Sequence, residues 1–138
     1  MSETKGGAVL EDWEVELVDR RLQEFASTVD GVRAAVVASV DGFALAQSAT
    51  EVSSGERLAA MTSAMLALAS AVGRELALGT LDVLMLDASE GKVLMQSIPL
   101  SRGSLLLMAA CNQRSVIGQV LWNARECGRR IQADLSGS

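Results

Sequence analysis

The chain has 138 residues, of which 49% are hydrophobic and 21% charged, a balance typical of one folded domain and unlike a disordered chain. Its formal net charge of -5 argues against a nucleic-acid or anionic-membrane surface, because phosphate binding requires clustered Lys and Arg. The first residues lack the basic and apolar regions of a secretory signal. Cys111 and Cys127 stand in apolar segments without a C-x-x-C pair, so we expect buried free thiols in a cytoplasmic protein.

The N-terminal third predicts a helix and a β-hairpin. We expect residues 1–11 to form a flexible tail and residues 12–135 to form a single domain. Apolar residues recur at helical spacing from Trp13 to Val29, and Asp30-Gly31 ends this amphipathic pattern. Two apolar segments, 32–40 and 43–49, then flank Asp41-Gly42, a dipeptide typical of a two-residue hairpin turn.

The middle of the chain predicts a second helix of unusual composition. Ser53 and Glu56 match a capping box at its start, and Gly79 is placed to end it. Between Arg57 and Arg74 lie 16 consecutive residues without a charge. They would rise about 24 Å at 1.5 Å per residue, short of the ~30 Å hydrocarbon core of a membrane. We therefore do not expect a membrane span; burial of the whole helix beneath the terminal helices stays an alternative.

The C-terminal half predicts three strands, over 81–89, 92–100 and 104–111, followed by a helix that begins at Ile117. The order α-β-β-α-β-β-β-α predicts an α+β fold with one five-stranded antiparallel sheet. Segments 32–40 and 104–111 are apolar on both faces, so we place them side by side in the middle of the sheet. The first and last helices then share one face, and the uncharged helix covers the other.

Catalytic chemistry is not indicated. The chain contains no histidine, which excludes Ser-His-Asp and Cys-His catalysis and His-containing zinc sites. Glycine-rich phosphate-binding motifs are also missing, so we expect no catalytic residues, metal or cofactor. The carboxylates nearest to an acid–base pair are interpreted as turn or solvent residues: Asp41, Asp82, Asp87 and Glu90. Four arginines are interpreted as solvated, with action on a partner's phosphates as the alternative: Arg57, Arg74, Arg102 and Arg114.

The uncharged helix carries two apolar stripes. The large residues are expected to pack on the sheet: Leu58, Met61, Met65, Leu68, Val72 and Leu76. The small residues are expected to meet a second copy of the chain: Ala60, Ala64, Ala67 and Ala71. The next strand would extend this homodimer interface if it lies at the sheet edge, through Leu81, Val83 and Met85.

The chain resembles the Roadblock/LC7 domain family over about residues 12–135. The resemblance rests on the order of elements and on three loosely patterned apolar segments: GVRAAVVASVDGFALA (31–46), ERLAAMTSAMLALASAVGRELALG (56–79) and GKVLMQSIPLSRGSLLLMAA (91–110). It implies a roadblock/profilin-like fold and a homodimer formed through the middle helix and the third strand. Family members associate with small Ras-like GTPases, in bacteria of the Mgl type, or serve as light chains and scaffolds in eukaryotic assemblies.

The resemblance implies a non-enzymatic module that binds and regulates a small Ras-like GTPase, with an effect on hydrolysis or nucleotide exchange. Bacterial relatives offer the exposed side of the paired middle helices to the GTPase. Carried onto this chain, that surface would comprise Ala59, Ser63, Leu66, Ser70 and Arg74. The helix departs from the family in its low charge, which leaves two alternatives: a ligand-sensing profilin/PAS-like domain, or a scaffold subunit without a GTPase partner.

Overall fold

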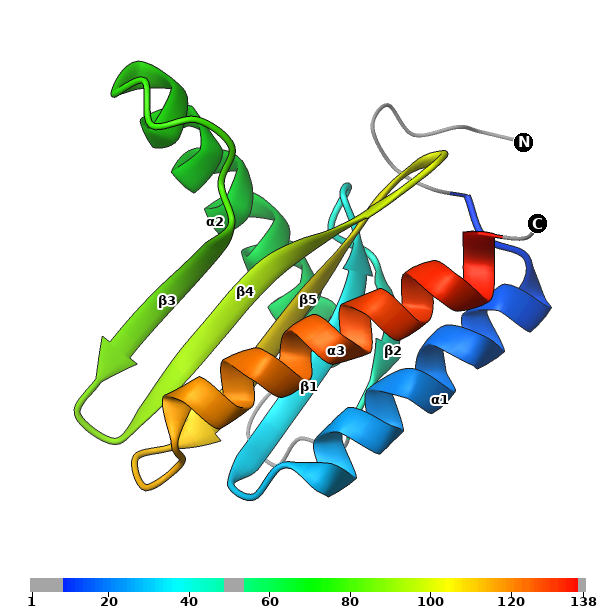
Figure 1. The fold of residues 1–138 in the computed structure, drawn as a ribbon, viewed down its shortest axis with the longest axis horizontal. Coiled ribbons are helices and arrows are strands. Elements are labelled where there is room, and N and C mark those ends of the chain that lie inside the picture. The colour runs from blue at the N-terminus through cyan, green and yellow to red at the C-terminus, as the bar shows by residue number, and fades with distance from the viewer. Residues whose placement is uncertain (1–8, 49–53, 137–138) are drawn as a thin grey trace.

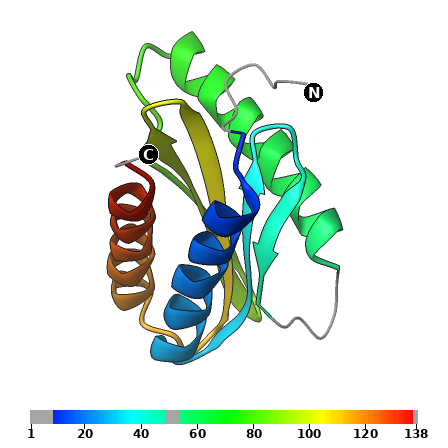
Figure 2. The same ribbon diagram turned by 90° about the vertical axis from the view of Figure 1, so that its right-hand side faces the viewer.

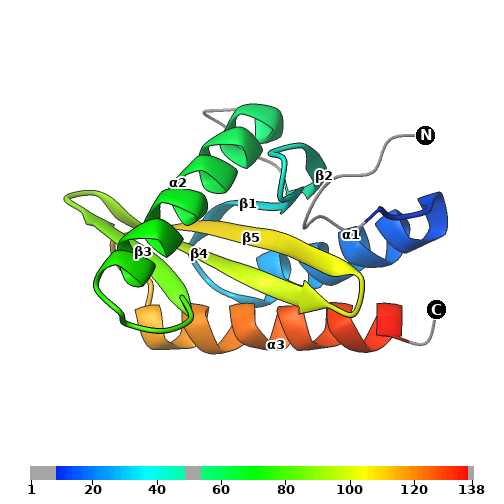
Figure 3. The same cartoon turned by 90° about the horizontal axis from the view of Figure 1, so that it is seen from above.

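The computed structural model describes residues 9–48 and 54–136. A five-stranded antiparallel sheet forms the middle layer, with α1 and α3 on one face and α2 on the other (Figures 1 and 2). Figure 3 shows this arrangement from above, with α2 and α3 on opposite sides of the strands. The elements are α1 (Asp12–Thr28), β1 (Val32–Ser39), β2 (Ala44–Gln47), α2 (Gly55–Glu75), β3 (Val83–Ala88), β4 (Gly91–Leu100), β5 (Gly103–Asn112) and α3 (Ile117–Ser136).

The sheet order is β2-β1-β5-β4-β3, which confirms the predicted element order and the central pairing of β1 with β5. Both strands are almost fully buried because helices cover both of their faces. The order also places β3 at one edge of the sheet and β2 at the other. The sheet of the predicted fold is therefore present, with β3 in the edge position that a strand-paired dimer would need.

Two separate apolar cores fill the layers. The larger core joins the sheet to α1 and α3, and its most deeply buried side chains include Val18, Leu22, Leu94, Leu107 and Ile131. Cys111 and Cys127 belong to this core as free buried thiols, as expected. The smaller core joins the sheet to α2 through Val36, Ala59, Leu66, Met95, Leu106 and Met108. Helix α2 is thus held by a thinner apolar layer than the other two helices.

Helix α2 presents a different face to the sheet from the one predicted. Its buried residues are Gly55, Ala59, Thr62 and Leu66, so three of the four contacting positions are small. The strand side chains opposite are large, namely Val36, Leu106, Met95 and Met108. The prediction that the large-residue stripe packs on the sheet is therefore wrong: only Leu58 and Met65 of that stripe are packed against this core.

The ends of α2 also differ from the predicted ones. Ser53 of the predicted capping box lies outside the described residues; the N-cap is Ser54, whose hydroxyl accepts from the backbone N–H of Arg57 at 3.1 Å. The helix ends at Glu75, four residues before the predicted end signal Gly79. Just after this end, Ala77 takes a φ of 55°. The backbone N–H of Ala77 donates to the carbonyl of Arg74 and that of Leu78 to the carbonyl of Gly73, a Schellman arrangement.

Candidate protein-interaction surface

The outer side of α2 carries a row of exposed large apolar residues, which we call the α2 apolar stripe. Met61 is 53% exposed, Leu68 69%, Val72 51% and Leu76 62%. They follow spacings of seven, four and four residues, so they lie along one side of the helix. No charged side chain interrupts this side between Arg57 and Arg74. A contiguous apolar row of this kind is typical of a surface that contacts another protein.

Strand β3 follows α2 in the chain and lies at the edge of the sheet, so one of its sides is open for strand pairing. Ala88 and Gly91 pair across the two-residue turn Ser89-Glu90, and such a hairpin closes on a hydrogen-bonded pair. Pairs of this kind alternate along an antiparallel ladder, so every second residue of β3 directs its backbone N–H and C=O away from β4. These outward residues are Val83, Met85 and Asp87.

The side chains of β3 divide between the two faces of the sheet. Val83 packs against the core of α1 and α3, and Met85 lies on that same face, 43% exposed. Leu84 packs against the α2 core, and Leu86 shares its face with 36% exposure. Of the three strand residues predicted at a dimer interface, only Leu81 packs with the α2 core. Leu84 and Leu86, which the sequence prediction did not include, lie on the face of the sheet that α2 covers, as the alternation of the strand could have indicated.

The small-residue stripe of α2 is also at the surface. Ala60, Ala64 and Ala67 are exposed and Ala71 is half-buried. Gly42, at a φ of 94°, lies close to this end of the helix, because a Cβ there would approach the Ala60 Cα to 3.1 Å. The alanines thus form a second exposed strip beside the α2 apolar stripe.

The five residues predicted to contact a GTPase do not form one surface. Ala59 is 0% exposed and Leu66 5%, because both pack on the sheet. The Ser63 hydroxyl donates to the carbonyl of Val40 at 2.5 Å, which fastens α2 to the β1–β2 hairpin. Ser63 and Ser70 are half-buried, and of the five residues only Arg74 is exposed. The helix is oriented so that Ala59 and Leu66 face the sheet, and the five predicted residues therefore do not form one exposed surface.

A groove of about 620 Å³ lies between α2 and one end of the sheet. Its floor is apolar, with Leu66, Leu81 and Leu106, and hydroxyl groups of Ser70 and Ser104 stand along it. Asp82 is the carboxylate of this lining, and it pairs with Arg125 of α3 at 2.5 Å. On β3 itself, Asp87 pairs with Lys92 at 3.2 Å. Both carboxylates near the β3 edge therefore have a cation beside them, which limits charge repulsion at that edge.

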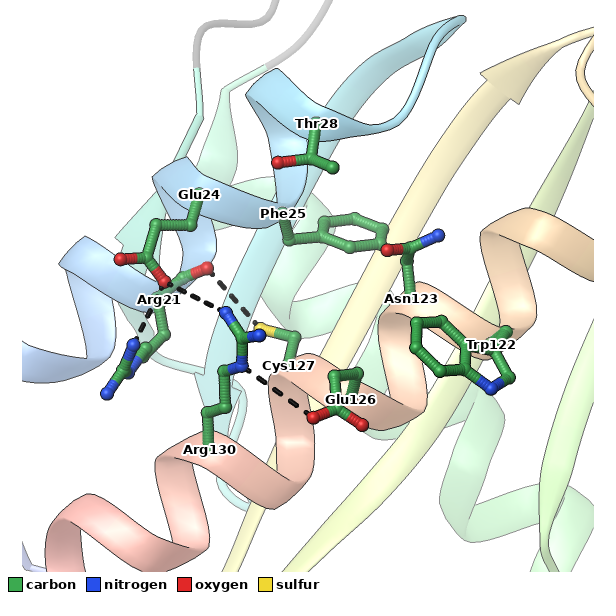
Figure 4. A pocket seen from close by; sticks show the side chains of 9 residues that line it. All are labelled: Arg21, Glu24, Phe25, Thr28, Trp122, Asn123, Glu126, Cys127 and Arg130. Atoms are coloured by element: carbon green, nitrogen blue, oxygen red, sulfur yellow. Dashed lines mark hydrogen bonds and ion pairs between the residues drawn. The ribbon is translucent and has the colours of Figure 1, made fainter.

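A second, smaller hollow of about 200 Å³ lies on the other face, between α1 and α3 (Figure 4). Arg21 and Arg130 reach Glu24 at 3.1 and 3.7 Å, and Arg130 also reaches Glu126 at 3.7 Å. Below these ion pairs, burial raises the pKa of the Cys127 thiol to about 12. The charged side chains of this hollow pair with one another, and the pair between Arg130 and Glu24 joins α3 to α1.

The described residues contain no cluster of three or more His, Cys, Asp or Glu side chains placed to hold a metal ion. Within the same residues, none of the helices combines the length and apolarity needed to cross a membrane. What the surface offers is an apolar helix side next to an open strand edge, which is the arrangement of a protein-interaction domain.

Comparisons with known proteins agree with this class. The family model of the Roadblock/LC7 domain matches residues 16–110, and the chain therefore belongs to the Roadblock/LC7 family. A comparison with curated protein sequences gives no match.

Solved structures share the fold at low sequence identity. A Roadblock/LC7 domain from Streptomyces avermitilis has a TM-score of 0.76 at 14% identity, covering 85% of this chain and 96% of that one. The gliding protein MglB of Thermus thermophilus has a TM-score of 0.78 at 16% identity, with 91% and 93% coverage. MglB of Myxococcus xanthus has a TM-score of 0.77 at 10% identity, with 91% and 92% coverage.

Proposed function

We propose that this chain is a homodimeric adaptor that binds and regulates a small Ras-like GTPase. The observation that carries the proposal is the α2 apolar stripe beside the open edge of β3. An exposed apolar side of this size is costly in water unless another surface covers it. Family membership supports a GTPase as the partner, because some members of the Roadblock/LC7 family associate with small Ras-like GTPases.

In the proposed dimer, the β3 strands of two copies pair antiparallel about a two-fold axis perpendicular to the sheet. This operation keeps both α2 helices on the same face of one continuous sheet. Met61, Leu68 and Val72 then take the interface role that the sequence suggested for the alanines, because large side chains bury more apolar area per contact. The alanine strip and Arg74 are left on the outer side of the helix pair, where a GTPase would bind.

The dimer is tested by placing a charge on the α2 apolar stripe. Leu68→Glu should make the protein monomeric in sedimentation experiments, because a carboxylate buried at an interface without a partner costs several kcal/mol. Trp122→Glu is the matched control, since Trp122 is 61% exposed on α3, away from α2. An unchanged mass for Leu68→Glu, or an equal loss for Trp122→Glu, would place the interface elsewhere.

The GTPase role needs its own experiment. The purified chain is mixed with the small Ras-like GTPase encoded nearest to it, loaded with GDP or with a non-hydrolysable GTP analogue. We expect a complex in at least one nucleotide state and a changed rate of hydrolysis or nucleotide exchange. Arg74→Glu should weaken this complex while leaving the dimer mass unchanged. A GTPase that neither binds nor changes rate in either state would refute this part of the proposal.

A further inference from the structure

An apolar hollow lies on the α2 face of the sheet, at the end where β3 turns into β4, and we call it the β3–β4 hollow. Its volume is about 370 Å³. Ala34, Val93 and Ala110 form its floor, and the last two also pack with the α2 core. Every described residue that lines it belongs to a strand or to the Ser89-Glu90 turn. Helix α2 of the same chain therefore leaves this end of the face uncovered.

The end of α2 has exposed apolar side chains at the other end of β3. The last buried residue of the helix is Leu66, whereas Val72 is 51% exposed and Leu76 is 62% exposed. Figure 1 shows the end of α2 near the start of β3 and the β3–β4 turn at the far end of that strand. The chain therefore does not cover its own hollow with the end of its own α2.

The two-fold axis of the proposed dimer brings the end of α2 and the hollow together. Antiparallel pairing of two β3 strands places the start of one strand beside the end of the other. Because the axis is perpendicular to the sheet, the α2 helix of the second copy stays on the same face. The end of that helix is thus carried to the end of the sheet where the β3–β4 hollow lies.

The rim of the hollow carries a cation without an ion pair among the described residues, Arg33, whose side chain is exposed. The register of β1 with β5 shifts at this residue, and such bulges re-aim a side chain. The other cation of the lining, Lys92, pairs with Asp87 at 3.2 Å. Glu90 lies in the turn, two strands away from Arg33. The β1 side of the hollow is therefore positively charged.

The end of α2 carries a charge of the opposite sign. Glu75 lies about 20° from Leu68 around the helix, at 100° per residue, so it flanks the α2 apolar stripe. Its side chain is exposed, and within the described ranges it has no cation paired with it. Arg74 lies on the other side of the helix. The charge that accompanies the stripe into a contact is therefore negative.

We propose that the β3–β4 hollow of each copy receives the end of α2 from the other copy. Val72 and Leu76 then lie on the apolar floor, and Glu75 lies beside Arg33 at the rim. This inference rests on the proposed homodimer and names what each copy contributes to it. The fit is supported by size and by charge, because large exposed side chains meet a floor rich in alanine and a free carboxylate meets a free guanidinium.

Exchanging the two charges tests this contact. Arg33→Glu and Glu75→Arg should each weaken the homodimer about tenfold in sedimentation equilibrium, because two-fold symmetry turns two attractions into two repulsions at once. The double variant should recover the affinity of the parent, since it restores opposite charges. Arg33→Glu combined with Glu16→Arg is the matched control: Glu16 is exposed on α1, so the net charge is the same but the affinity should stay low.

Filling the hollow tests the apolar contact. Ala88 is exposed on β3 and lines the hollow, so Ala88→Trp should weaken the homodimer without changing the circular dichroism spectrum. Ala133→Trp, at an exposed position of α3, is the control and should leave the affinity unchanged.

Three results would overturn the proposal: single charge variants that the exchange does not rescue, a dimer affinity that none of the changes alters, or a loss of GTPase binding in Arg33→Glu with an unchanged dimer. The last result would assign the hollow to the GTPase. Failure of the proposed dimer itself would show separately, as an unchanged mass for Leu68→Glu.

Discussion

Arg21 and Asp134 join α1 to α3 through two parallel hydrogen bonds, 2.7 Å from Nε to Oδ2 and 3.0 Å from Nη2 to Oδ1. The fork of a guanidinium matches a carboxylate in this way, whereas an ammonium group cannot make both bonds in one plane. Arg21→Lys should therefore lower the free energy of unfolding by about 1 kcal/mol in urea denaturation. Arg20→Lys on the exposed side of α1 is the control, and an equal loss there would contradict the role of the fork.

The same pair predicts a pH dependence of stability. Its hydrogen bonds from Arg21 lower the pKa of Asp134 below the ordinary value. The stabilisation is therefore fully present above the unfolded pKa of about 3.9 and is lost as the pH falls through the lower native pKa. Asp134→Asn should be less stable than the parent at pH 7, and the difference should shrink toward zero near pH 2. A difference that stayed constant over this range would show that the carboxylate charge is not involved.

A buried carboxylate fixes the start of α1 to the β4–β5 hairpin. Glu14 is 1% exposed, accepts from the Glu11 N–H at 3.0 Å and forms an ion pair with Arg102. Removing the cation leaves a buried charge less well compensated. Arg102→Gln should therefore destabilise the fold by roughly 1–3 kcal/mol. Thermal or urea unfolding measures this loss, and Glu14→Gln combined with Arg102→Gln should cost less than the sum of the single changes.

The end of α2 is strained at one residue. Ala77 adopts a φ of 55°, where its Cβ is unfavourable, and glycine is the residue that this C-terminal position prefers. Ala77→Gly should therefore raise the free energy of unfolding, by about 0.5–1 kcal/mol. Ala133→Gly, on the exposed side of α3, should lower it by a similar amount because glycine weakens a helix interior. The prediction fails if both substitutions destabilise the protein.

The Cys127 thiol should resist alkylation. Burial raises its pKa to about 12, so little thiolate forms at neutral pH. At pH 8 the native protein should react with iodoacetamide at Cys127 on the order of 1,000-fold more slowly than the protein unfolded in urea. Mass spectrometry of the modified peptide measures both rates, and comparable rates in the two states would contradict the buried position.

The order of the sheet could be predicted because it depends on burial, which composition reveals directly. Segments 32–40 and 104–111 are apolar at consecutive positions, and only strands covered on both faces require that pattern. Asp41-Gly42 located the first hairpin for a similarly local reason, the tolerance of glycine for the φ of 94° found there, but the predicted two-residue turn is wrong in length. The Ser39 N–H donates to the Phe43 carbonyl at 2.9 Å, so the turn has three residues, 40–42. Local chemistry and burial together therefore determined the topology.

The orientation of α2 could not be predicted because its sequence offers no charged residue to mark the solvent side. Large residues were expected to face the sheet, yet the strands opposite already carry Met95 and Met108. The space between helix and sheet then accepts only small partners, such as Ala59 and Thr62. This complementarity depends on which strand residues lie beneath the helix, and that depends on the packing angle of the whole element.

Helix α2 is supported unevenly along its length, since its last buried residue is Leu66 and its C-terminal end extends beyond the start of β3 in Figure 1. Amide hydrogens from Ala59 to Leu66 should exchange slowly even in an isolated copy, because their N–H groups bond within the helix and the sheet covers this part of it. Those from Leu68 onward have protein on fewer sides and should exchange slowly only when another molecule covers them. The early part of α2 thus serves as a reference for exchange in the folded chain, and the part from Leu68 onward reports whether another molecule covers the helix. Comparing the two parts would follow assembly residue by residue.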